Sequence, residues 1–128
     1  MKSKYYNKKV VVDGYEFDSR KEANRFCELR LLLRAGKISN LQLQKEYELI
    51  PAQYEVVPTG ELYTRGERKG ELKTKRICIE QAVNYVADFV YTENNKTVVE
   101  DTKGVKTEKY IIKRKLMLWR HGIKIKEL

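Results

Sequence analysis

The chain has 128 residues, of which 41% are hydrophobic and 35% are charged, and its net charge is +9. This length and composition predict one folded domain with a single core. No apolar run approaches the roughly 20 residues of a membrane span, and the segment MKSKYYNKKVVVDG lacks the apolar stretch of a signal peptide. We therefore expect a cytosolic protein without a membrane partner.

The residues that many metal and nucleotide sites require are scarce. Cys27 and Cys78 have no CxxC spacing and lie within apolar patterns, so we expect buried free thiols in a reducing compartment. The single histidine, His121, argues against zinc sites built on paired histidines. No GxxxxGK[ST] loop is present, so nucleotide-driven motor chemistry is unsupported.

The first elements expected are a short hairpin and a helix. Residues 8–17 form the hairpin with Asp13-Gly14 as its turn, and its shared face is expected to hold Lys9, Val11, Tyr15 and Phe17. Ser19 and Glu22 fit a capping box, which predicts the helix start, and Ala35-Gly36 supplies its end. The buried stripe of this helix is expected to hold Ala23, Phe26, Cys27, Leu29, Leu32 and Leu33.

Glu22 has two interpretations. Its carboxylate can cap the helix by bonding a free backbone N–H. Alternatively, because it extends the stripe of Phe26 toward the sheet, it can contribute an acid to a metal site. Both roles can hold in part.

Residues 40–50 alternate between apolar and polar side chains, which predicts a strand that ends at Pro51. Its apolar face is expected to hold Leu41, Leu43, Tyr47 and Leu49. Gln44, on the other face, either contacts a scissile phosphate or belongs to an ordinary polar surface. Residues 51–80 are basic and interrupted by glycine, which is typical of an insertion: either a flap that closes over nucleic acid or a plain exposed loop.

Residues 84–104 carry the functional interpretation. Asn94-Asn95 separates two runs rich in Val, Tyr and Phe, which predicts a two-residue type I′ hairpin. In that register, Asp88 lies opposite Asp101. Like charges placed opposite each other destabilise a sheet. Either a divalent cation with oxygen ligands binds between the two acids, or both acids are merely solvated on an exposed hairpin.

Lys103 shares the face of Asp101, because side chains alternate along a strand. Two carboxylates and one ammonium then converge near the open end of the hairpin. That combination suits metal-assisted phosphodiester hydrolysis, in which carboxylates hold Mg²⁺ and a lysine orients the nucleophile or stabilises developing charge.

A second helix is expected between a Thr107 cap and Gly122, with a short strand at Ile123 and Ile125. One side of this helix is expected to hold Ile111, Ile112, Lys115, Leu118 and Trp119, with Leu116 adjoining. The other side is expected to hold Lys106, Lys109, Lys113 and Arg120. Residues 103–126 contain nine Lys or Arg residues and one acid, which indicates either a nucleic-acid-binding surface or a solvated helix face. The candidate DNA contacts are Gln44, Lys106, Lys109, Lys113, Arg114 and Arg120. Tyr110 is expected either to contact a phosphate or, as the preferred alternative, to have a core role.

The order helix, strand, hairpin carrying Asp…AspXLys, helix and strand resembles the PD-(D/E)XK nuclease superfamily. Asp88 matches its first motif acid, Asp101-Thr102-Lys103 matches its (D/E)XK element, and Glu22 matches the acid often found on its first helix. The phrases FDSRKEANRF, LQLQ, YVADFVY and VVEDTKG are similar to a small phage- and prophage-encoded branch that is often compared with Holliday junction resolvases. The resemblance covers residues 10–125 without 51–80, and Ala87 replaces the namesake proline.

This resemblance implies a restriction-endonuclease-like α/β core, in which a mixed β-sheet is flanked by two helices in the order αβββαβ, here after an N-terminal hairpin. Residues 1–128 would form a single domain with 51–80 as an insertion or flap. It also implies Mg²⁺ or Mn²⁺ held by Asp88, Asp101 and the Thr102 carbonyl, with Glu22 binding directly or through water. Lys103 would position the attacking water.

The implied activity is metal-dependent endonuclease cleavage of duplex or branched DNA, in phage recombination or replication within the bacterial cytoplasm. Resolvases usually act as dimers because two strands must be cut, so a homodimer is expected. The competing interpretation is a non-catalytic, basic DNA-binding module on the same fold. A restriction-type enzyme with sequence readout is a third interpretation, although no appended recognition domain is visible.

Overall fold

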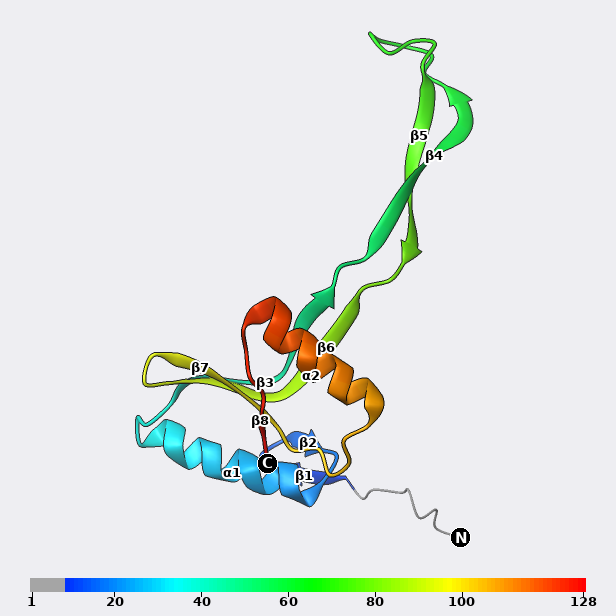
Figure 1. The fold of residues 1–128 in the computed structure, drawn as a ribbon. Helices are drawn as coiled ribbons and strands as arrows, with labels where there is room; N and C mark the ends of the chain where they lie inside the picture. Colours follow the sequence, from blue (N-terminus) through cyan, green and yellow to red (C-terminus); the bar gives the residue numbers. More distant parts are fainter. Residues whose placement is uncertain (1–8) are drawn as a thin grey trace. The chain divides into compact units, whose positions relative to one another are not determined.

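The computed structural model describes residues 9–128 and is a mixed α/β structure with two helices. The chain divides into two compact units, one made of the residues up to Tyr47 and from Tyr85 onward, the other of Glu48–Asn84. In chain order, the elements are β1 (Val10–Val12), β2 (Tyr15–Phe17), α1 (Arg20–Arg34), β3 (Ser39–Ile50), β4 (Gln53–Leu62), β5 (Leu72–Glu80), β6 (Val83–Glu93), β7 (Lys96–Asp101), α2 (Glu108–His121) and β8 (Lys126–Glu127) (Figure 1). Within residues 9–128, no helix is long and apolar enough to cross a membrane.

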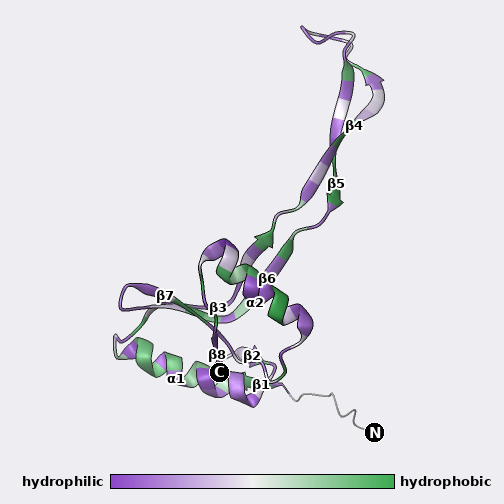
Figure 2. Ribbon diagram, in the orientation of Figure 1, coloured by the Kyte–Doolittle hydropathy of each residue, from purple (hydrophilic) through white to green (hydrophobic). Residues whose placement is uncertain are grey.

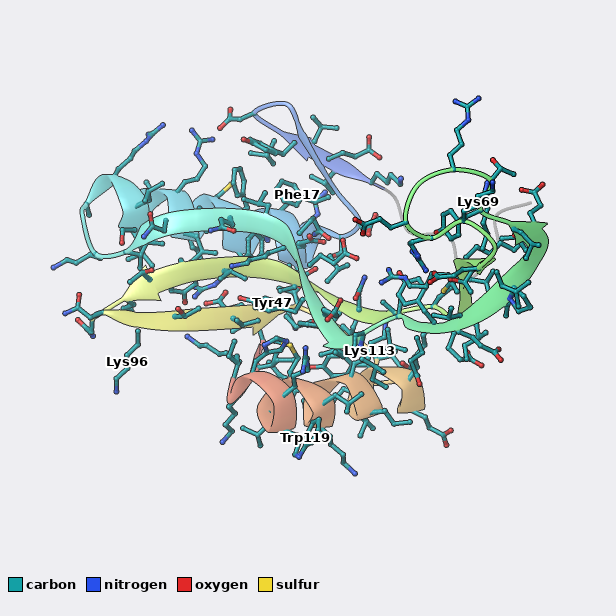
Figure 3. The ribbon with its side chains drawn as sticks, turned by 90° about the horizontal axis from the view of Figure 1, so that it is seen from above. Phe17, Tyr47, Lys69, Lys96, Lys113 and Trp119 are labelled. Carbon is teal, nitrogen blue, oxygen red and sulfur yellow. The ribbon has the colours of Figure 1, made fainter. Side chains whose placement is uncertain are left out.

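A four-stranded sheet in the order β3-β6-β7-β8 forms the centre of the first unit. β6 and β7 pair antiparallel, whereas β7 and β8 pair parallel, so the sheet is mixed, as expected. Viewed from above, the sheet lies between α1 and α2 (Figure 3). The candidate site residues predicted from the sequence therefore come from the helices and strands of one layered unit and from the segment that joins β7 to α2.

The β6–β7 hairpin has the predicted turn and register. Asn94 and Asn95 have φ angles of 51° and 62°, as a type I′ turn requires. Glu93 pairs with Lys96, and the ladder continues to Phe89 opposite Glu100. Asp88 and Asp101 come one step after that last pair, at the open end of the hairpin.

Helix α1 begins and ends where the sequence predicts. The Ser19 side chain accepts a hydrogen bond from the Glu22 backbone N–H at 3.1 Å. Phe26 and Leu29 are buried and pack in one cluster with Phe17 of β2 and Phe89 of β6. The N-terminal hairpin and the sheet therefore cover the same stripe of α1.

The burial of the cysteines was predicted wrongly. Both are free, but Cys27 on α1 and Cys78 on β5 are exposed. Leu33, at 40% exposure, also lies outside the buried stripe. Cys27 and Leu33 are exposed because the packed face of α1 is narrower than the sequence suggests. Cys78 is exposed on β5, which belongs to a two-stranded sheet.

The predicted faces of the first hairpin were also wrong. Val10 pairs with Phe17 and Val12 pairs with Tyr15, and residues directly opposite each other point to the same side. Val10 and Val12 therefore pack with Phe17, while Val11 is 65% exposed. The predicted start of this hairpin at residue 8 lies outside the described residues.

Strand β3 does not keep its apolar side chains on one face. Leu41 and Leu43 pack against the α1 cluster, whereas the Tyr47 ring contacts His121 of α2, with ring centroids 5.5 Å apart. Between them Gln44 has a φ of 54°, a left-handed conformation that is uncommon for a residue with a side chain. The change of face follows from this local irregularity of the strand.

Helix α2 spans the predicted residues, with Thr107 as its N-cap and Gly122, at φ 67°, as its C-cap. The side that faces the protein was predicted wrongly. Tyr110 and Met117 are buried, whereas Ile112, Leu118 and Trp119 are 59%, 55% and 79% exposed. Tyr110 has the expected core position.

The second unit is more regular than a plain loop. β4 and β5 form a two-stranded antiparallel sheet, with Tyr54 paired to Cys78 and Leu62 paired to Leu72. Hydrophobic and hydrophilic residues both occur along these strands (Figure 2). The guanidinium of Arg76 lies 3.7 Å from the centre of the Tyr54 ring, a contact that covers part of one exposed aromatic side chain.

Candidate metal and nucleic-acid site

Gln44 contacts two acids from different elements, Glu22 and Asp88, and a third acid, Asp101, lies close enough to both to interact electrostatically. Glu22 comes from the first turn of α1, Asp88 from β6 and Asp101 from the end of β7. The Gln44 amide nitrogen lies 3.0 Å from Glu22 Oε1 and 3.5 Å from Asp88 Oδ1. Gln44, whose backbone is left-handed, is therefore the residue of β3 whose side chain contacts two of the three acids.

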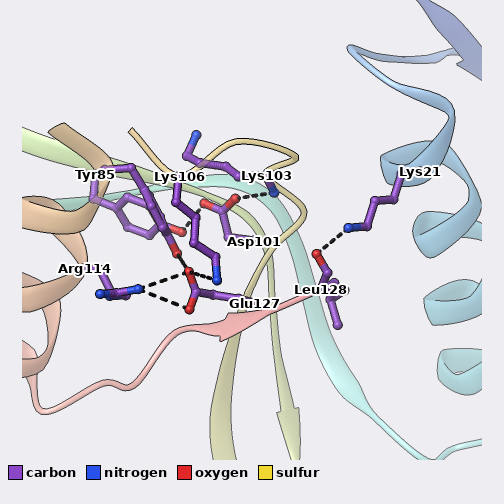
Figure 4. Close-up of polar contacts among 9 residues, drawn as sticks. Lys21, Tyr85, Asp101, Lys103, Lys106, Arg114, Glu127 and Leu128 are labelled. Atoms are coloured by element: carbon purple, nitrogen blue, oxygen red, sulfur yellow. Dashed lines mark hydrogen bonds and ion pairs between the residues drawn. The ribbon is translucent and has the colours of Figure 1, made fainter. Parts of the chain in front are cut away.

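Asp88 and Asp101 are held in place by neighbouring donors. The backbone N–H and the hydroxyl of Thr102 both donate to Asp88 Oδ2 at 2.9 Å. Asp101 Oδ2 accepts from the Tyr85 hydroxyl at 2.7 Å, and Asp101 Oδ1 accepts from the Lys103 backbone N–H at 3.0 Å (Figure 4). Thr102 thus joins the two acids, since it follows Asp101 in the chain and bonds Asp88.

Two of the three acids are buried, and no cation of the described residues pairs with any of them. Glu22 is 6% exposed and Asp101 is 1% exposed. Within residues 9–128, no Lys or Arg forms an ion pair with Glu22, Asp88 or Asp101. Burial of unpaired carboxylates is unfavourable, because the charged form loses its hydration.

The pKa values of Glu22 and Asp101 reflect that environment. Burial, followed by the charge of Asp88, raises the pKa of Glu22 to about 7, and Asp101 adds to this effect. Burial also raises the pKa of Asp101, with a further contribution from Asp88 that the Tyr85 hydrogen bond opposes. The three carboxylates therefore act on one another electrostatically.

The donor set fits a hard divalent cation in its chemistry. Mg²⁺ is typically held by one or two carboxylates together with several waters, and its ligands are oxygen atoms. Among the residues that the structure describes, no group of three or more His, Cys, Asp or Glu side chains is arranged so that it could hold a metal ion. The sequence predicts Asp88 and Asp101 as direct metal ligands and Glu22 as a further ligand, either direct or through water.

Lys103 lies next to the acids but makes a different contact. Its ammonium nitrogen is 5.4 Å from the centre of the Tyr110 ring, and its side chain is exposed. Tyr110 in turn packs near Tyr85, with ring centroids 6.4 Å apart. The Lys103 ammonium therefore lies on the side of the site where Tyr85 bonds Asp101.

The candidate DNA contacts differ in their surroundings. Lys106 and Arg114 lie 3.6 Å and 3.4 Å from carboxylate oxygens of Glu127, which also accepts from the Tyr110 hydroxyl at 2.9 Å (Figure 4). Part of their charge is therefore balanced within the protein. Arg120 is exposed near the end of α2.

Sequence reasoning missed two contributors to the site. Alternation along β6 puts Tyr85 on the face opposite Asp88, so no spacing rule brings its hydroxyl to Asp101. The Thr102 hydroxyl was also missed, because only its backbone carbonyl was considered. A Thr or Ser between the two motif residues Asp101 and Lys103 is the signal that points to it.

One acid near the site has a structural role. Glu100 is fully buried and receives two hydrogen bonds from Arg25 of α1, at 2.8 Å and 2.6 Å, and one from the Tyr91 hydroxyl. Burial alone would raise the pKa of Glu100, but the Arg25 and Tyr91 hydrogen bonds outweigh burial and lower it. In contrast to the three site acids, Glu100 has its counter-charge inside the protein.

Comparison with known proteins identifies a family. The model of the family described as "protein of unknown function (DUF1064)" matches residues 2–126. No curated protein and no solved structure matches the chain. The chain belongs to the DUF1064 family.

Proposed function

We propose that this member of the DUF1064 family is a metal-dependent DNA endonuclease with a PD-(D/E)XK nuclease core. The observation that carries the proposal is the convergence of Glu22, Asp88 and Asp101, with two of the three buried and none paired with a cation in residues 9–128. A structural role alone leaves that arrangement unexplained, since Glu100 shows how this fold neutralises a buried acid with Arg25.

Asp88 and Asp101 would hold Mg²⁺ or Mn²⁺, with the Thr102 carbonyl and Glu22 as further ligands. When bound, such an ion neutralises charge on a phosphate and makes water a better nucleophile. Thr102 and Tyr85 fix the orientation of the two aspartates through the hydrogen bonds at 2.7–2.9 Å. Preorganised ligands of this kind need little rearrangement when charge develops.

Lys103 would act on the phosphate in this proposal. It follows Asp101 by two residues, and its side chain is exposed beside the buried acids. In the proposed reaction, its ammonium orients the attacking water and stabilises the negative charge that develops on the phosphoryl oxygens. Gln44, which contacts both Glu22 and Asp88, would position the phosphate or the carboxylates that hold the metal ion.

DNA would be held through its backbone by the basic residues of α2 and the segment before it, including Lys106, Lys109, Lys113, Arg114 and Arg120. Phosphate contacts carry no sequence information directly, so we expect cleavage that depends on DNA structure more than on sequence. We further propose that the substrate is branched or duplex DNA and that a homodimer cuts two strands.

The test is cleavage of end-labelled four-way junction, flap, linear duplex and single-stranded DNA in Mg²⁺, Mn²⁺ or EDTA. We expect cutting only with metal, and its loss in the Asp101→Asn variant. Glu67→Gln, which alters an exposed acid of the second unit, serves as the charge-matched control and should cut as the native chain does.

The second candidate function is a non-catalytic DNA-binding module. The exposed basic side chains of α2 favour it equally, because they bind a DNA backbone with or without chemistry. Binding of all four DNAs without any cleavage in Mg²⁺ or Mn²⁺, unchanged by Asp101→Asn, would decide for the module and against the nuclease.

A further inference from the structure

A hollow of about 270 Å³ lies between the start of β6, the segment that follows β7 and the first two turns of α2. Three of its lining residues are lysines: Lys103, Lys109 and Lys113. The remaining lining residues are Tyr85, Val86, Thr107 and Tyr110. Tyr85 connects the hollow to the acids, because it lines the hollow and donates to Asp101.

The three lysines have no acidic ion-pair partner in the part of the chain that the structure describes. Within residues 9–128, none of them forms an ion pair with a carboxylate, whereas Lys106 and Arg114 nearby share Glu127. Lys113 lies on the sheet side of α2, opposite Trp119 (Figure 3), and is half-buried. Burial, and then the charges of Lys109 and Lys103, lower the pKa of Lys113. Three cations thus repel one another around one hollow.

Other donors at the hollow are already used. The Tyr85 hydroxyl donates to Asp101 and the Tyr110 hydroxyl donates to Glu127. The Thr107 hydroxyl oxygen accepts from the Tyr110 backbone N–H, which leaves its own proton free to donate. The ammonium groups are therefore the main donors for a ligand here, and a compact anion with several acceptor oxygens matches them.

We propose that this lysine pocket binds one phosphate group of the nucleic acid, next to the phosphate at the acids. The inference deepens the proposed function and rests on it for the identity of the substrate, but anion binding by the pocket does not depend on cleavage. Bound phosphate relieves the repulsion among the three ammonium groups and fixes the strand relative to Asp101. Lys109 and Lys113 would then be phosphate-binding residues that position the DNA.

The first test uses inorganic phosphate as the probe and thermal unfolding in EDTA as the readout. A ligand that binds only the folded chain raises its unfolding temperature. We expect a saturable rise for the native chain, beyond that in sodium chloride of equal ionic strength, and no such rise for Lys109→Gln/Lys113→Gln. The control is Lys37→Gln/Lys96→Gln, which removes two exposed lysines outside α2 and the segment before it and should respond to phosphate as the native chain does.

The second test measures DNA affinity in EDTA at several salt concentrations. Removal of a lysine that contacts a phosphate weakens binding for all sequences and reduces the slope of log affinity against log salt by about one. We expect a reduction of about two for Lys109→Gln/Lys113→Gln and a smaller one for the control. Duplexes with and without 5′-phosphates show whether the bound group is terminal or internal.

Equal responses of the pocket variant and the control to phosphate and to DNA would overturn the inference. Absence of cleavage by the native chain would not affect it, because neither readout involves metal or chemistry. A phosphate response that disappears only in the pocket variant, in a chain that never cuts DNA, would keep the pocket and remove the nuclease.

Discussion

Replacing Glu22 by glutamine should stabilise the metal-free protein, and by an amount that depends on pH. Glu22 is buried, and its charged form is disfavoured by burial and by Asp88. Glutamine has nearly the same shape, and its side-chain oxygen can still accept from the Gln44 amide, which now bonds Glu22 at 3.0 Å. The substitution therefore removes the charge and keeps the packing.

The pKa of Glu22 gives the size and the sign of the effect. Its pKa is about 7 in the folded chain against an ordinary value of 4.5. Between these values the folded state binds more protons than the unfolded state, so the free energy of unfolding falls as pH rises. The pKa difference of about 2.5 units corresponds to about 3 kcal/mol, lost between pH 4.5 and pH 7 and constant above that range.

Urea unfolding in EDTA at half-unit steps from pH 4.5 to pH 8 measures this. The two chains should be equally stable near pH 4.5, and Glu22→Gln should be more stable by about 3 kcal/mol at pH 8. Parallel pH profiles for the native chain and the variant would refute the reasoning, because they would mean that Glu22 titrates alike in the folded and unfolded states.

Three further substitutions test the contacts around the site, each by urea unfolding at pH 7. Arg25→Met should destabilise the protein by about 3–5 kcal/mol, since Glu100 is left as an unpaired buried charge; combining it with Glu100→Gln should restore most of the loss, and no restoration would argue against this cause. Asn95→Val should cost about 1–2 kcal/mol because φ is 62° there, whereas Asn95→Gly should be tolerated; equal effects of the two would contradict the turn type. Thr102→Val removes one of two bonds to Asp88 and should cost about 1–2 kcal/mol; an unchanged stability would show that the hydroxyl bond contributes little.

The features that follow from local rules were predictable from the sequence. The Asn94-Asn95 turn fixes the register of β6 and β7 by itself, so the pairing of Glu93 with Lys96 and the positions of the two hairpin acids follow from arithmetic. The ends of both helices follow from their capping residues, Ser19 and Thr107, whose side chains bond the first backbone N–H groups.

The features that depend on tertiary packing were not predictable. In α2 the apolar residues are numerous enough to form more than one stripe, and the sheet buries the Tyr110–Met117 side, leaving Trp119 exposed. In β3 a left-handed residue, Gln44, changes the face of the strand, and no glycine marks that position. Glu22 could be placed on the correct side of α1, but its contact with Gln44 required the fold.

The site itself was predictable as a set of acids but not as a network. The hairpin register brings Asp88 and Asp101 together, because the ladder set by the Asn94-Asn95 turn reaches Phe89 and Glu100, one step before them. Tyr85 reaches Asp101 although alternation assigns it to the opposite face from Asp88, since pairing between β6 and β7 ends at Phe89 and Glu100. Beyond the last ladder pair, side-chain direction no longer follows from counting.

The most direct test of the central claim is calorimetric titration of the chain with Mn²⁺ in the absence of DNA. If Asp88 and Asp101 hold a divalent cation, the native chain and Glu67→Gln should bind Mn²⁺ alike, and Asp88→Asn and Asp101→Asn should each bind it at least about ten-fold more weakly, since each loses a charged oxygen ligand. Equal binding by all four proteins, or none by the native chain, would contradict the metal site on which the proposed nuclease depends.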